Sequence, residues 1–227
     1  MNARLAVVPL AAVLALSTAA VAAPTKIACN AIEDATGDTF AVRSQDQQGV
    51  YGPQEDAFDI VTGDLASDGK TVTAVVRVKK FSRTVASSPA GVVMGVDFLV
   101  GSGTDIVSLK AVLIQGQPDR FEASFKAGDA VANTPSTFVG TVTGVVDEAK
   151  NEVRIHAPVA MLSAFGAIKK GTKLIPNANE SAVVSRGVPP VTSSAGQPMT
   201  TRGPFADIAP GGKSVTVGAK TCVAVGK

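Results

Sequence analysis

Four aspartates early in the chain supply the side chains best suited to hold a metal ion. They stand in loop-like stretches: Asp34, Asp38, Asp56 and Asp59. Ca²⁺ takes about 6–8 oxygen ligands from flexible loops, so this group predicts a calcium site. The stretch does not follow the EF-hand pattern, because Gln45 stands where that loop needs a glutamate. The alternative is that Asp34 and Asp38 only cap turns and that Gly37 supplies a positive φ.

The chain offers few side chains for catalysis. Acyl transfer needs a nucleophile, a base and an orienting group, and there is a single histidine, His156. Strand parity places His156 on the same face as Arg154, which predicts a partly exposed strand histidine. Ser67 and Lys70 have the Ser-x-x-Lys spacing of penicillin-recognising enzymes, but the companion Ser-Asp-Asn and Lys-Thr-Gly elements are missing. We expect no enzyme activity, no catalytic residues and no cofactor other than calcium.

Aromatic side chains of the kind that bind sugars are also rare. Sugar-binding sandwiches use exposed rings, above all Trp and Tyr, whereas this chain has no Trp and one tyrosine, Tyr51. The phenylalanines fall mostly in strand-like runs, where core packing accounts for them. Tyr51 lies in the loop-like sequence GVYGPQED and is the aromatic residue best placed to contact a ligand. Ordinary packing within the loop is the alternative.

The first residues predict an export signal. Arg4 precedes an apolar run over residues 5–16, and small residues lead to a cleavage position at Ala23. An apolar run of about a dozen residues is too short to span a membrane, which needs roughly 20. Residues 1–23 are therefore interpreted as a removed signal peptide, and we expect a secreted protein with no membrane span.

The two cysteines stand near the two ends of the mature chain, at Cys29 and Cys222. Cysteines of exported chains usually pair in the oxidising space outside the cytoplasm. We predict an intramolecular Cys29–Cys222 disulfide that closes nearly the whole domain. A covalent dimer through Cys29 is the alternative.

Hydrophobic periodicity places these residues on an all-β framework. Short Val- and Thr-rich runs alternate with period two between turn residues, which is typical of antiparallel strands. Strands are expected at 58–65, 70–78, 91–100, 105–115, 120–125, 137–146, 152–157, 173–175, 181–185 and 214–217. A short helical turn is expected near Val159–Phe165, and the Pro-, Gly- and Ser-rich segment 187–212 is predicted to be a long surface loop. Residues 24–227 are expected to form a single antiparallel β-sandwich domain.

Five sequence blocks carry a resemblance to known domains. They are residues 29–40 (CNAIEDATGDTF), 58–78 (FDIVTGDLASDGKTVTAVVRV), 92–100 (VVMGVDFLV), 140–159 (GTVTGVVDEAKNEVRIHAPV) and 214–223 (SVTVGAKTCV). The blocks resemble β-sandwich domains of secreted bacterial, chiefly actinobacterial, proteins, which are similar in architecture to DOMON-like domains and family 9 carbohydrate-binding modules. The resemblance implies the sandwich fold. It says less about function, because the wider group includes sugar binders, haem binders and domains with no known ligand.

Charge and composition limit the classes of binding partner that we expect. The chain has 21 Lys and Arg against 19 Asp and Glu, a net charge of +2, with no basic stripe interleaved with aromatics, so we expect no nucleic-acid partner. We expect a secreted, non-catalytic module with a binding or accessory role, with carbohydrate or an extracellular protein as partner. The alternative is a structural or surface protein-interaction domain without a small ligand.

Overall fold

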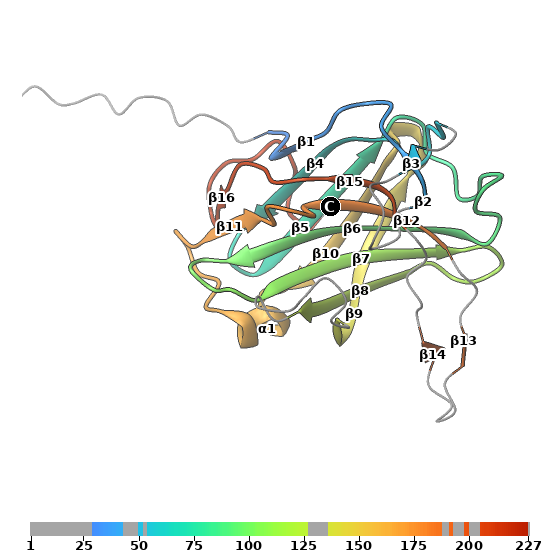
Figure 1. The fold of residues 1–227 in the computed structure, drawn as a ribbon. Coiled ribbons are helices and arrows are strands. Elements are labelled where there is room, and N and C mark those ends of the chain that lie inside the picture. Colours follow the sequence, from blue (N-terminus) through green and yellow to red (C-terminus); the bar gives the residue numbers. More distant parts are fainter. Residues whose placement is uncertain are drawn as a thin grey trace, which may run out of the picture.

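The computed structural model describes residues 29–42, 50–51, 54–126, 136–187, 191–192, 198–199 and 205–226. The predicted signal peptide, residues 1–23, lies outside these ranges. Nearly all regular structure within them is antiparallel β-sheet (Figure 1), which confirms the predicted all-β class.

Twelve strands form one continuous sheet. Ten of them follow in the order β1-β4-β5-β10-β9-β8-β7-β6-β11-β16, and β12 pairs with both β6 and β15. Their bounds are β1 Ile32–Glu33, β4 Ile60–Ser67, β5 Thr71–Val78, β6 Gly91–Val100, β7 Ile106–Ile114, β8 Arg120–Lys126, β9 Thr137–Asp147, β10 Glu152–Pro158, β11 Lys173–Pro176, β12 Ala182–Arg186, β15 Phe205–Ala209 and β16 Val215–Thr216. Two small ribbons stand apart: β2 Phe40–Val42 with β3 Val50–Tyr51, and β13 Val191–Thr192 with β14 Pro198–Met199.

The sheet curls back on itself at β9. The first half of this strand pairs with β8 and the second half with β10. The parts of the sheet on either side of β9 therefore face each other, with β5 packed against β6 and β10 against β7 (Figure 1). Gly144 allows the close approach at the curl, because a side chain there would collide with the ring of Phe121 on β8. The two layers of the sandwich are thus joined along one side.

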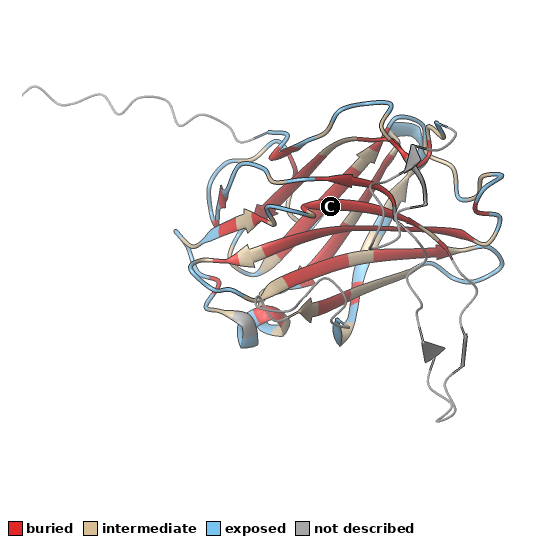
Figure 2. Ribbon diagram, viewed as in Figure 1, coloured by how far each residue is buried: buried red, intermediate tan, exposed pale blue. Residues whose placement is uncertain are grey.

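Alternate side chains of the strands fill the space between the layers. On β6, one face contributes four fully buried residues to the core: Val92, Met94, Val96 and Phe98. The facing layer contributes Leu65 of β4 and Ile155 of β10 to the same cluster. Burial is concentrated in the strands, while the connecting turns are exposed (Figure 2). This removal of apolar surface from water is the main force that holds the layers together.

The strands of the sheet fall where hydrophobic alternation predicts them, with a few additions. Each predicted segment contains a strand, and α1 (Val159–Leu162) followed by the 3₁₀ turn η2 (Ser163–Phe165) occupies the place of the predicted helical turn. A second 3₁₀ turn, η1, spans Glu148–Lys150. The segment 187–212 differs from the predicted surface loop, because its later part is β15, whose residues 206–209 are buried against β12. Surrounding Pro, Gly and Ser residues obscured this short strand in the sequence.

Candidate cation site

The connection from β1 to β2 carries two aspartates into a tight turn. β1 pairs with β4, with Ile32 opposite Gly63, and the chain then turns at Gly37, whose φ is +86°. Glycine suits this position because L-residues with a side chain rarely adopt a positive φ. The Gly37 N–H donates to Asp59 Oδ1 over 2.9 Å, which fixes the turn to the start of β4. Asp34 and Asp38 flank the turn on its two sides.

Asp207 reaches the same place from the other end of the chain. It stands opposite Val184 in the β12–β15 pairing, and Val184 belongs to the core, so Asp207 points between the layers. The side chain is fully buried. Its Oδ2 accepts a 2.7 Å hydrogen bond from the Ile60 N–H, and its Oδ1 accepts one of 2.9 Å from the Ile208 N–H. Two backbone donors therefore hold this carboxylate in a fixed orientation.

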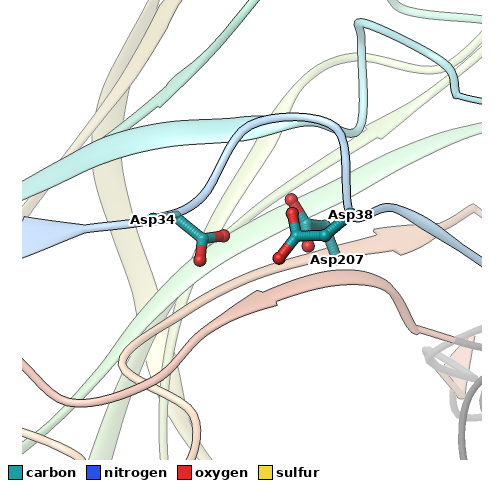
Figure 3. A group of neighbouring side chains, drawn as sticks. All are labelled: Asp34, Asp38 and Asp207. Carbon is teal, nitrogen blue, oxygen red and sulfur yellow. The ribbon is translucent and has the colours of Figure 1, made fainter.

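The three carboxylates meet at this edge of the sandwich (Figure 3). One oxygen from each of Asp34, Asp38 and Asp207 lies within 4.8 Å of the other two. Asp34 Oδ2 and Asp38 Oδ1 are buried atoms with no hydrogen-bond partner. Buried polar atoms are normally paired, so these two oxygens are positioned to share a proton or to bind a cation. We call Asp34, Asp38 and Asp207 the carboxylate cluster.

Burial and mutual repulsion make the cluster reluctant to carry its full negative charge. Desolvation, followed by repulsion from Asp38, raises the pKa of Asp34 to about 7. Desolvation also raises the pKa of Asp207 to about 8, although the hydrogen bond from the Ile60 N–H opposes the shift. The pKa of Asp38 is raised by desolvation and by the charge of Asp59. Near neutral pH the cluster must therefore hold protons or bind a cation.

The geometry suits a hard divalent cation. Ca²⁺ binds carboxylate oxygens at about 2.3–2.6 Å, so two of its ligands lie at most roughly 5 Å apart. The 4.8 Å limit among the three oxygens agrees with that span. Three carboxylates fill only part of a coordination shell of about 6–8 oxygens, and water or backbone carbonyl groups would supply the rest.

The structure separates the four aspartates that the sequence grouped. Asp34 and Asp38 belong to the cluster, and the backbone N–H of Ala35 partly opposes the rise in the pKa of Asp34. Asp59 fixes the Gly37 turn instead of joining the cluster. Asp56 is 45% exposed and pairs with Lys79 over 2.8 Å. The third carboxylate, Asp207, was not predicted, and its only signal in the sequence is an acid placed among apolar residues in FADIA.

Tyr51, the predicted ligand contact, lies in β3. Its side chain lies outside the part of the chain that the structure describes. The suggestion that Tyr51 meets a ligand therefore stays a prediction.

The predicted disulfide is present. Cys29 and Cys222 are joined across 193 residues of sequence, with their Cα atoms 5.2 Å apart. It ties the approach to β1 to the segment that follows β16. The bond is intramolecular, as predicted.

His156 is more buried than strand parity alone predicted. It does lie on the face of β10 opposite the core residue Ile155, but only 8% of it is exposed. Its Nδ1 lies 3.0 Å from Thr73 Oγ1, and its Nε2 is buried without a partner. Burial lowers the pKa of His156, and the charge of Arg154 lowers it further. Parity identifies the face of a strand but not what covers that face.

Comparison with protein-family models, with curated protein sequences and with solved structures finds no match for this chain. None of the helices in the described part of the chain has the length and hydrophobicity needed to cross a bilayer.

Proposed function

We propose that the chain is an exported, non-catalytic accessory module whose loop end binds calcium. The observation that carries this proposal is the carboxylate cluster, with its two buried oxygens that lack a partner. Calcium bound there would join the β1–β2 connection to β15, two segments far apart in the sequence. The site would then act as a structural clamp.

The composition of the cluster favours a weak calcium site of the extracellular kind. Extracellular modules bind Ca²⁺ with dissociation constants of about 10⁻⁴–10⁻³ M, and fewer charged ligands weaken a site. Protons are the competing occupants, because the pKa of Asp34 is raised to about 7 and that of Asp207 to about 8. Calcium therefore binds best on the alkaline side of neutrality, where fewer protons have to be displaced.

Export is supported by the disulfide and by the leader sequence. Disulfides persist in oxidising compartments outside the cytoplasm, and Cys29–Cys222 is formed in the folded chain. Residues 1–23 have the charged start, apolar run and small-residue end of a cleaved signal. The resemblance to secreted sandwich domains points to an accessory role beside other exported proteins, with carbohydrate as one candidate ligand class.

The alternative is a surface-interaction domain with no small ligand. Two large apolar residues of β9 favour it, since Phe138 is 59% exposed and Val145 is 49% exposed. Both stand opposite residues of neighbouring strands, Ser124 and Arg154. If a protein partner uses this strand, Phe138→Ser will weaken that complex and leave any calcium response of the module intact.

Thermal unfolding of the exported protein tests the calcium proposal. We expect the melting temperature to be higher in millimolar calcium than in chelator, because a ligand that binds only the folded state stabilises it. Asp34→Asn should abolish the difference, and Asp56→Asn, a nearby aspartate outside the cluster, should preserve it. Equal melting temperatures of the unaltered protein in chelator and in calcium would refute the proposal.

A further inference from the structure

The last described residues lie across the outer face of the layer formed by β4, β5 and β10. We call residues 218–226 the C-terminal strap. At its start, the Gly218 N–H donates to the Ser67 carbonyl oxygen over 2.7 Å. At its end, the Gly226 N–H donates to Thr73 Oγ1 over 3.0 Å. The strap is thus hydrogen-bonded to β4 at one end and to β5 at the other.

A small apolar contact holds the middle of the strap. Val223 is 4% exposed and packs with Ala66 and Val75 in a cluster separate from the main core. Val225 is partly buried against the same cluster. Within the described residues, these contacts are less extensive than those of a strand inside the sheet, which favours local opening of the strap.

The site at the end of the strap includes an unsatisfied polar atom. Thr73 Oγ1, which accepts the Gly226 N–H, also lies 3.0 Å from His156 Nδ1. His156 Nε2 is buried with no partner, and such an atom costs free energy that contact with water would recover. Release of this end of the strap would break the Gly226–Thr73 hydrogen bond and leave Thr73 Oγ1 with His156 Nδ1 as its neighbour.

The two sides of the disulfide are anchored very differently. On the Cys29 side, Ile32 is fully buried and the Ala31 N–H donates to Asp64 Oδ1 over 3.1 Å. The Ala31 carbonyl oxygen also accepts the Lys213 N–H over 2.7 Å. On the Cys222 side, the described contacts are those of the strap, with Val223 packed in the small apolar cluster. Both cysteine residues are exposed, which favours access of a reductant to the bond between them.

We propose that Cys29–Cys222 is a site of thiol–disulfide exchange that controls the C-terminal strap. The reacting partner is a dithiol, either a small molecule or the active site of an exported oxidoreductase. Reduction frees the strap from Ala66, Val75 and Thr73, while β1 and the sheet remain in place. This site is separate from the carboxylate cluster and does not depend on calcium.

The exchange is balanced by the dithiol alone. One thiolate of the dithiol attacks one sulfur of the Cys29–Cys222 bond, forming a mixed disulfide and releasing the other cysteine as a thiolate. The second thiol of the reductant, as its thiolate, then attacks the mixed disulfide and releases the remaining cysteine. The reductant ends as a disulfide, the protein ends with two thiols, and the two protons of the dithiol pass to them.

Reduction under native conditions tests this proposal. The exported protein is treated with dithiothreitol without denaturant, and hydrogen exchange is followed by mass spectrometry. We expect both thiols to become alkylatable while the sheet stays folded, and strap amides to exchange about tenfold faster or more. Amides of β5 and β10 that pair within the sheet should stay protected.

His156 provides a second readout, because it is the single histidine and gives one resolved NMR titration. The strap contacts Thr73 Oγ1, which lies beside His156 Nδ1, so release of the strap should shift the pKa of His156. The Cys29→Ser/Cys222→Ser double variant should match the reduced protein in both measurements. The proposal is overturned if thiols appear only when the whole protein unfolds. Unchanged strap exchange after complete reduction would overturn it equally.

Discussion

Two groups of buried or partly buried carboxylates adjoin the β4–β5–β10 layer, and they differ in what neutralises their charge. Asp64 and Glu152 lie on its outer face, and Arg77 contacts both, at 2.7 Å and 3.0 Å. Arg154 adds a 2.6 Å contact to Glu152. The carboxylate cluster has no ion pair with Lys or Arg among the described residues.

The outer network is neutralised by side chains of the protein itself, whereas the carboxylate cluster is neutralised by protons or by a cation from solution. Arginine presents fixed donors that satisfy carboxylate oxygens and balance their charge, so the outer network is complete within the protein. The carboxylate cluster leaves two buried oxygens unpaired and shifts its pKa values upward. Buried acids therefore indicate a binding site only where the fold does not supply the opposite charge.

Removal of Arg77, which pairs with Asp64 and Glu152, should have the largest effect on the free energy of unfolding. Arg77→Met leaves Asp64 and Glu152, which are 4% and 2% exposed, without one of their partners. We expect a loss of about 3 kcal/mol in the free energy of unfolding, since breaking a buried pair strands a charge. Urea unfolding measures the loss. Arg83→Met is the control, because Arg83 pairs at the surface with Asp119 and should cost about 0.5 kcal/mol or less. Equal losses for the two variants would contradict the comparison.

Neutralising one acid of the carboxylate cluster should increase the free energy of unfolding when a chelator removes calcium. Asp34→Asn keeps an oxygen acceptor for the Ala35 N–H and removes one of three crowded charges. At about pH 8 we expect the variant to be more stable than the unaltered protein without calcium. In about 10 mM calcium the order should reverse, because the unaltered protein gains about 1.5–3 kcal/mol at extracellular-type affinities. Unfolding in the two buffers gives both comparisons, and a variant less stable in each would contradict the account.

The pH dependence of the stability should reflect the raised pKa values of Asp34 and Asp207. A carboxyl group whose pKa is higher in the folded state binds more protons folded than unfolded, so stability falls as pH rises. The fall should begin near the ordinary value of 3.8 and be complete above the raised pKa values of about 7 for Asp34 and about 8 for Asp207. Calcium should flatten this fall by replacing the protons. Urea midpoints measured across this range, with and without calcium, check it. A stability in chelator that rises with pH across this window would be the wrong sign.

A substitution in the turn between Asp34 and Asp38 should have a smaller effect on stability. Gly37→Ala places a side chain at φ +86°, which costs about 1 kcal/mol. The site has room for the extra carbon, whose nearest neighbour would be 4.0 Å away, so the loss comes from the backbone alone. We expect the melting temperature of the variant in chelator to fall modestly. We also expect calcium to raise its melting temperature less than that of the unaltered protein, because calcium binding is weaker. A stability equal to that of the unaltered protein would show that the turn is not held in this conformation.

The sequence predicts this fold well where the pattern is local. Residues 70–78 alternate with period two, and β5 forms there. Asp34 and Asp38 are near neighbours, so a ligand-bearing loop could be predicted from them. Asp207 joins them only through the pairing of β15 with β12, which no local pattern in the chain reveals. The burial of His156 escaped prediction for the same reason, because its surroundings include a distant segment.

Direct measurement of calcium binding is the sharpest test of the proposal that the carboxylate cluster is a calcium site. Equilibrium dialysis of the purified protein against radioactive calcium, at about pH 8 where few protons compete, counts the ions bound to each chain. We predict one ion, with a dissociation constant of about 10⁻⁴–10⁻³ M, lost in Asp34→Asn and retained in Asp56→Asn. No bound calcium at about 10 mM, or the same binding in both variants, would contradict the account.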